Sequence, residues 1–148
     1  MPYDPILSSQ NNASRERMRA LFARLDESQY ALPLGNDWTI GTALLHVAVF
    51  DRRAIEILER WERDGVSPSP NDADIINAAL LPFLRALPTS AIPNLALEFA
   101  DALDAKLAAL PDAVLDQFET TAAHPFNLSR AAHRNEHLEQ IEQALNKG

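Results

Sequence analysis

Apolar residues recur along this chain at steps of three and four, which is the spacing of one face of an α-helix. The clearest series lies in residues 39–63, where a single polar residue, Asp51, shares a face with Leu44, Val47, Ile55 and Leu58. Thr39, a favoured N-cap residue, stands at the start of this series, and Gly65 follows its end. The pattern therefore predicts a long amphipathic helix.

The same spacing predicts three further long helices, over residues 8–25, 93–110 and 127–145. Only 4 glycines occur, and alanine and leucine are abundant, which favours helix over sheet. A chain of 148 residues has the length of one domain. We therefore expect an all-α protein, a four-helix bundle that forms a single domain over residues 1–148.

Two shorter helical pieces are predicted in the connections between the long helices. One begins at Asp72 or Asp74 and runs to Leu87, and Pro82 inside it predicts a kink or a break. The other is a single turn over residues 112–115, after Pro111 has ended the preceding helix.

The chain is acidic, with a formal net charge of -8 at pH 7. Acidic surfaces repel phosphate backbones, so we expect no nucleic-acid partner. No apolar run approaches the roughly 20 residues that span a bilayer, and the first residues lack a signal-peptide pattern, so we expect no membrane association and a cytoplasmic location. The absence of cysteine excludes disulfides, cysteine-ligated zinc and a thiol nucleophile from the chain itself.

Two of the four histidines, His133 and His137, stand four residues apart in the last predicted helix. Residues at this spacing share a helix face with Cβ atoms about 5–6 Å apart, so both imidazoles can bind one ion at about 2.0–2.1 Å. The glutamate that directly follows the first histidine in zinc proteases is replaced by Arg134, which argues against that class.

His46 lies in the apolar run of residues 44–50 and needs a partner there. A backbone carbonyl or the carboxylate of Asp51 or another acid would satisfy its ring. A metal ion would satisfy His46, His133 and His137 at once and leave an open position for water or substrate. Three imidazoles favour zinc or nickel, with iron and manganese as further alternatives.

Other polar residues near these histidines have two interpretations each. The fourth histidine, His124, is a further ligand, a group that supports a ligand, or a loop residue, and we favour the loop. Trp38 lines a pocket or packs against the start of its helix, and we favour packing. Asp51 and Glu56 could orient His46, whereas the alternative for Asp51 is a salt bridge with an arginine. Asn135 is expected to be a buried polar anchor of the last helix.

Arg130 and Arg134 could bind an anionic substrate near the histidines, or they form ordinary ion pairs at the surface. For Arg134 we expect the surface ion pair.

Two segments resemble signatures of the DinB-like (YfiT-like) metal-binding superfamily. Residues 37–40 (DWTI) with 44–51 (LLHVAVFD) resemble its first signature, although Phe50 stands where the family often has tryptophan, and residues 133–142 (HRNEHLEQIE) resemble its C-terminal one. The resemblance covers the whole length of the chain. It implies a four-helix bundle with one divalent metal held by His46, His133 and His137.

The same superfamily includes thiol-dependent transferases and isomerases, resistance proteins and members without known activity. The resemblance therefore implies a metal-dependent, thiol-using transferase or hydrolase that acts on a small molecule. The alternative is a non-catalytic scaffold, stress-response binder or dimerisation module. We expect a homodimer, which is a common state of small helical bundles.

Overall fold

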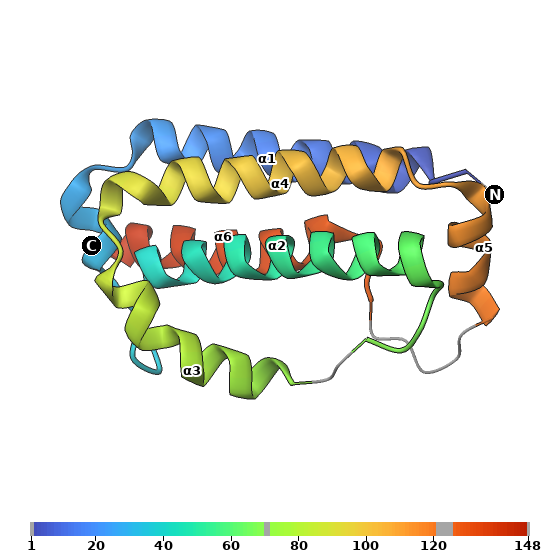
Figure 1. The fold of residues 1–148 in the computed structure, drawn as a ribbon. Helices are drawn as coiled ribbons and strands as arrows, with labels where there is room; N and C mark the ends of the chain where they lie inside the picture. The colour runs from blue at the N-terminus through green and yellow to red at the C-terminus, as the bar shows by residue number, and fades with distance from the viewer. Residues whose placement is uncertain (1, 70–71, 121–125, 148) are drawn as a thin grey trace.

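The computed structural model describes residues 2–69, 72–120 and 126–147, and these residues are predominantly helical. Four long helices lie side by side: α1 (Pro5–Arg24), α2 (Ile40–Asp64), α4 (Ile92–Ala108) and α6 (Arg130–Lys147). In Figure 1, α1 and α4 form one layer, and α2 and α6 form the other. Helix α2 contacts α4 and α6, and α1 contacts the same two helices, so the four surround a common core.

The shorter elements cover the edges of these four helices. They are η1 (Glu27–Ala31), β1 (Pro33–Gly35), β2 (Trp38–Thr39), α3 (Ala73–Ala86), η2 (Thr89–Ala91) and α5 (Asp112–Thr120). Helix α3 runs beside α2 on the side away from α1 and α4, and α5 lies across one end of the long helices (Figure 1). The expectation of an all-α protein is confirmed, apart from the small β1–β2 hairpin.

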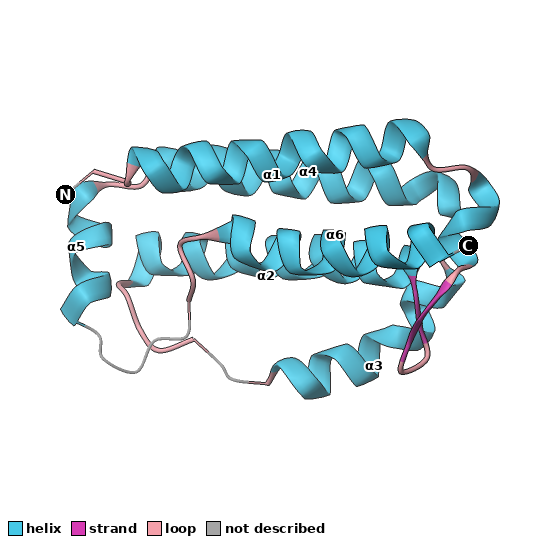
Figure 2. Ribbon diagram, turned by 180° about the vertical axis from the view of Figure 1, so that it is seen from behind, coloured by secondary structure: helices cyan, strands magenta, loops and turns pink. Residues whose placement is uncertain are grey.

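The hairpin between η1 and α2 was not predicted from the sequence. Its two strands pair antiparallel, with Pro33 opposite Thr39 and Gly35 opposite Trp38. The turn residues Asn36 and Asp37 have φ angles of 53° and 65°, which is the left-handed conformation that two-residue hairpin turns require. Figure 2 shows this hairpin beside the end of α6, where it carries Trp38 to the start of α2.

Local signals set the ends of α2 as predicted. The backbone N–H of Thr42 donates to the hydroxyl of Thr39 at 3.2 Å, and the N–H of Thr39 donates to the hydroxyl of Thr42 at 2.7 Å. These reciprocal bonds satisfy donors that a helix start leaves open. The helix ends at Asp64, and the φ of 93° at the following cap residue, Gly65, favours glycine.

Other boundaries differ from the predictions. Helix α1 begins at Pro5 because Asp4 caps it through the N–H of Ile6 at 2.8 Å, whereas α6 begins only at Arg130. Helix α5 is nine residues long rather than a single turn. Helix α3 continues through Pro82, which is exposed, so the carbonyl that loses its helical partner lies where water can bond to it.

The core has two parts along the long helices. One part lies between η1, the starts of α2 and α4, α1 and the second half of α6, and it includes Met18, Leu21, Ile40, Leu44, Leu138 and Ile141. The other lies near α5 and includes Leu58, Trp61, Leu103, Leu107 and Leu115. Each such side chain contributes about 1.5–3 kcal/mol by leaving water. The polar groups described next lie along the contact between α2 and α6.

No single helix among the described residues combines the length and the apolar character needed to cross a membrane. Only Ala73–Ala86 and Thr89–Ala108 taken together meet those criteria, as a pair bent by 114°.

Candidate metal centre

Three histidines from two helices meet between α2 and α6. The Nε2 atom of His133 lies 2.9 Å from Nε2 of His46 and 3.2 Å from Nε2 of His137. His46 comes from α2 and is only 7% exposed, whereas His133 and His137 are partly exposed on one face of α6. The three candidate ligand atoms all lie within 4.8 Å of one another. We call His46, His133 and His137 the histidine cluster.

Hydrogen bonds on the outer side of two rings determine where their protons lie. The amide oxygen of Asn77, in α3, lies 2.9 Å from Nδ1 of His46, and the amide oxygen of Gln140 lies 3.1 Å from Nδ1 of His137. An amide oxygen only accepts, so each Nδ1 must donate its proton. A neutral ring with a protonated Nδ1 has a lone pair on Nε2. Both lone pairs therefore face the middle of the histidine cluster.

His133 cannot satisfy both neighbours. Its buried Nδ1 has no hydrogen-bond partner among the described residues, and a neutral ring has only one N–H. A proton on Nε2 can be donated well to only one of the two facing nitrogens. With the proton on Nδ1 instead, three lone pairs face one another. In both cases the histidine cluster has more acceptors than donors.

Burial keeps these rings neutral. Desolvation, reinforced by His137, lowers the pKa of His46 to about 4, although its bond to Asn77 raises it slightly. Burial with the nearby His137 and His46 lowers the pKa of His133 to about 3. Burial also lowers the pKa of His137. Neutral imidazole is the form that binds metal ions.

The spacing of the three nitrogens fits a common metal ligand set. Two nitrogens that each lie about 2.0–2.1 Å from one ion are about 2.9 Å apart at a right angle and about 3.4 Å apart at the tetrahedral angle. The observed separations of 2.9 and 3.2 Å fall in this range. The carboxamides of Asn77 and Gln140 hold the outer nitrogens, as groups behind metal-ligating histidines usually do. The residues present therefore fit a three-histidine metal site.

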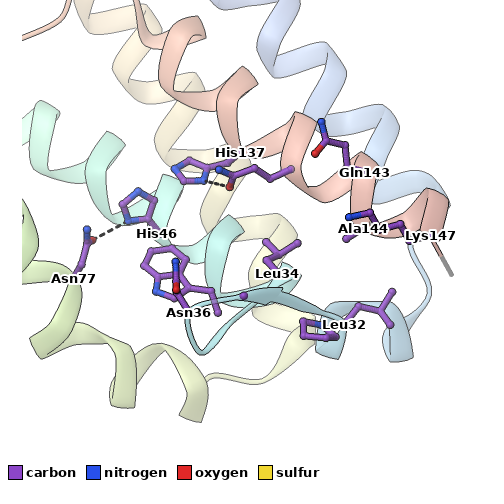
Figure 3. A pocket seen from close by; sticks show the side chains of 13 residues that line it. Leu32, Leu34, Asn36, His46, Asn77, His137, Gln143, Ala144 and Lys147 are labelled. Atoms are coloured by element: carbon purple, nitrogen blue, oxygen red, sulfur yellow. Dashed lines mark hydrogen bonds between the residues drawn. The ribbon is translucent and has the colours of Figure 1, made fainter.

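A cavity of about 600 Å³ opens beside His46 and His137. In Figure 3, these two rings lie at one side of it, and Leu32, Leu34 and Lys147 line the other parts. Trp38 has the two roles that the sequence left as alternatives, because it lines this cavity and also packs on the rings. Its ring centroid lies 4.9 Å from that of His46 and 6.4 Å from that of His137, nearly parallel to the latter.

Neither proposed acidic partner of His46 binds it. Asp51 is fully buried and accepts hydrogen bonds from Arg130 and Arg134, so its alternative, a salt bridge with an arginine, is confirmed. Glu56 forms surface ion pairs with Arg52 and Arg60. One and a half helical turns separate Asp51 from His46, which directs the carboxylate toward a different part of α6.

The expectation that Arg134 forms a surface ion pair is wrong. Its side chain is 0% exposed and joins two carboxylates, with Nε 3.0 Å from Asp51 and Nη1 2.8 Å from Asp104. Arg130 is also buried and lies 3.3 Å from Asp51. We call Asp51, Asp104, Arg130 and Arg134 the ionic cluster. Asn135, the expected buried anchor, is only half-buried and accepts from Arg17 at 3.3 Å.

Some residues of the site were not assigned from the sequence. Gln140 lies three residues after His137 on the same helix face, and this spacing was a usable signal. Phe50 lies four residues after His46 on α2, a spacing that was equally usable, and its ring centroid lies 4.7 Å from that of His46. Asn77 had no such signal, because tertiary packing brings α3 to the His46 ring. His124 lies outside the described residues.

Comparison with known proteins adds no relative. No family model matches this chain, and neither a curated protein nor a solved structure is significantly similar to it. The function must therefore be argued from the site.

Proposed function

We propose that this protein binds one divalent metal ion through the Nε2 atoms of His46, His133 and His137. The observation that carries the proposal is the convergence of three neutral imidazoles with too few N–H donors to satisfy one another. Such ligands favour zinc or nickel, and the proposal keeps iron and manganese as alternatives. An ion of this kind acts as a Lewis acid or lowers the pKa of a bound water or thiol.

Residues around the histidine cluster support this role. Asn77 and Gln140 hold the protons on the outer nitrogens, so that Nε2 of His46 and of His137 keeps its lone pair. Trp38 packs on both rings and limits their rotation. The adjoining cavity of about 600 Å³ has the size of a small-molecule site.

On this basis we propose a metal-dependent transferase or hydrolase that acts on a small molecule. The DinB-like superfamily, with its four-helix bundle, is the family that we propose for the chain. A thiol co-substrate would come from outside, because the chain has no cysteine to supply one. The reducing cytoplasm, where such thiols persist, is the location that belongs to this proposal.

Elemental analysis of the purified protein, before and after dialysis against a chelator, tests the metal site. We expect one first-row transition ion per chain, its loss on chelation, and little metal in His133→Ala or His137→Ala. His124→Ala, the same substitution at the fourth histidine, should retain the ion. Folded protein that takes up none of zinc, nickel, iron and manganese after chelation would overturn the proposal. Equal thiol-transferase turnover by wild type and His137→Ala would reject the metal mechanism.

A non-catalytic scaffold or dimerisation module is the second candidate, and α3 favours it. This helix exposes apolar residues at helical spacing, with Ile75 73% and Phe83 71% exposed. Exposed apolar faces of this kind mark association surfaces. We expect a homodimer in sedimentation velocity, and a monomer for Phe83→Ser with its metal content unchanged. A monomeric wild-type protein would reject the dimer.

A further inference from the structure

A second cavity, of about 310 Å³, reaches the histidine cluster from another side. His46 and His133 form part of its wall, and its other lining residues include Phe50, Arg53, Phe126 and Arg130. Its volume lies at the lower end of the range of about 300–1,000 Å³ found for small-molecule sites.

We propose that this cavity binds a small carboxylate with a flat apolar body, held by Arg53 and Arg130. The proposal rests on the proposed function, because it identifies the substrate class that would reach the metal at His46 and His133. The two guanidinium groups bind the carboxylate, and the flat body lies against the rings of Phe50 and Phe126.

The charge of the cavity wall supports an anion. Among the described residues that line it, two are arginines and none is an aspartate or glutamate. The whole chain has a net charge of -8. The charged side chains that line this cavity are both positive, so the cavity wall has the opposite sign of charge from the chain as a whole. Planar guanidinium groups bind carboxylates through paired N–H donors.

The two arginines keep carboxylate partners of their own. Asp51 lies 3.0 Å from Arg134 and 3.3 Å from Arg130, so one carboxylate is shared by two guanidinium groups. Among the described residues, Asp72 lies 3.7 Å from Arg53, whose side chain is 26% exposed. These contacts orient the two arginines, and the carboxylates that make them, Asp51 and Asp72, are not among the residues that line the cavity.

The aromatic residues give the cavity flat walls beside each positive charge. The Arg53 guanidinium carbon lies 6.0 Å from the centroid of Phe50, and that of Arg130 lies 5.8 Å from the centroid of Phe126. Cation–π contacts of this kind hold guanidinium groups in place. The Phe50 ring also lies 5.9 Å from the His133 ring, so a flat ligand on this wall extends from the arginines toward the histidine cluster.

The start of α6 adds to the same preference. Arg130 is the first residue of α6 and His133 completes its first turn, and both line the cavity. The N-terminal end of a helix carries a partial positive charge. A carboxylate in this cavity therefore faces two guanidinium groups and a favourable helix end.

Calorimetric titration with benzoate tests the assignment, with benzamide as its uncharged counterpart. The titrations use the metal-loaded protein and, in parallel, the chelated protein. We expect benzoate to bind with a dissociation constant in the millimolar range and benzamide to bind at least tenfold more weakly. Arg53→Gln should weaken benzoate at least tenfold. Arg52→Gln, the same substitution on the exposed neighbour of Arg53, should leave it unchanged.

Arg130→Gln is a second variant for this test, but it disturbs a buried ion pair. If this variant does not fold, the result for Arg53→Gln decides whether the proposal holds. Equal binding of benzoate and benzamide, or equal weakening by the Arg52 and Arg53 variants, would overturn the proposal. Benzoate binding that depends on Arg53 in protein that takes up no metal would leave the carboxylate site standing while the metal proposal fails. Metal uptake without Arg53-dependent benzoate binding would leave the metal site standing while the carboxylate proposal fails.

Discussion

The histidine cluster and the ionic cluster both lie between α2 and α6, but they differ in how completely the protein satisfies them. In the ionic cluster, Asp51 lies between Arg130 and Arg134, and Asp104 lies 2.8 Å from both Arg134 and Arg15. In the histidine cluster, three Nε2 atoms face one another and a buried nitrogen of His133 has no partner among the described residues.

The difference shows what each cluster contributes. Folding alone completes the ionic cluster, because every positive charge in it meets a negative one. The histidine cluster is not completed by the described residues, and under the proposed function a bound ion would complete it. A buried polar group without a partner costs roughly 1–3 kcal/mol, so this cluster lowers the stability of the metal-free protein. Arrangements of this kind are expected at binding sites, where function and stability conflict.

Among the substitutions, the largest change in stability is expected from Arg134→Leu. Asp51 and Asp104 would then keep their buried charges with only part of their compensation, and breaking a buried pair in this way costs about 3–5 kcal/mol. Urea unfolding followed by circular dichroism measures the loss. Arg63→Leu is the control, because Arg63 is exposed and its ion pair with Asp64 should contribute less than about 1 kcal/mol. Equal losses in the two variants would contradict the structural role of the ionic cluster.

The same substitution one residue earlier, His133→Leu, should have the opposite result. Zinc affinity should fall by more than about 100-fold, because a ligand is lost. The free energy of unfolding in chelator should stay the same or rise, because leucine has no unpartnered nitrogen. Calorimetric zinc titration and urea unfolding measure the two effects. A stability loss of more than about 2 kcal/mol would remove the distinction between the clusters.

Acid should destabilise the metal-free protein through the histidine cluster. Histidines of the unfolded chain take up protons near pH 6.5, whereas in the folded protein the pKa of His46 is about 4 and that of His133 about 3. Between pH 6.5 and about 4 the unfolded state binds more protons, so the free energy of unfolding falls as the pH falls, by about 1.4 kcal/mol per pH unit for each histidine. Urea midpoints across this range test the slope. It should be shallower in His133→Leu, and an equal slope would assign the acid sensitivity to other groups.

Among the substitutions, the smallest effect is expected from Asn77→Ala, which removes the acceptor behind His46. Loss of such a support lowers metal affinity about 10–100-fold, equivalent to about 1.4–2.8 kcal/mol. Calorimetric zinc titration is the measurement. Asn94→Ala, at an exposed asparagine of α4, is the control and should leave the affinity unchanged. An unaltered affinity in Asn77→Ala would show that the orientation of His46 does not depend on this hydrogen bond.

The spacing of apolar residues in the sequence also contained a signal for the ionic cluster. Ala131, Arg134, Leu138 and Ile141 follow one another at steps of three and four, and all four are buried. This spacing places Arg134 on the buried face of α6, where Asn135 was expected. Asp51 is likewise the one polar residue in the buried series Leu44, Val47, Asp51, Ile55 and Leu58 of α2. Opposite charges on two buried faces are a usable sign of a buried ion pair.

Local features of the sequence determined the existence of the long helices, the start and end of α2, and the shared face of His133 and His137, because each depends on residues within a few positions. Only the tertiary structure decided that His46 meets that pair, that Asn77 holds its outer nitrogen, and that Arg53 and Arg130 line one cavity. Periodicity shows that a helix face is buried, but the residues that face it come from distant parts of the chain, where side-chain fit and charge determine the contact.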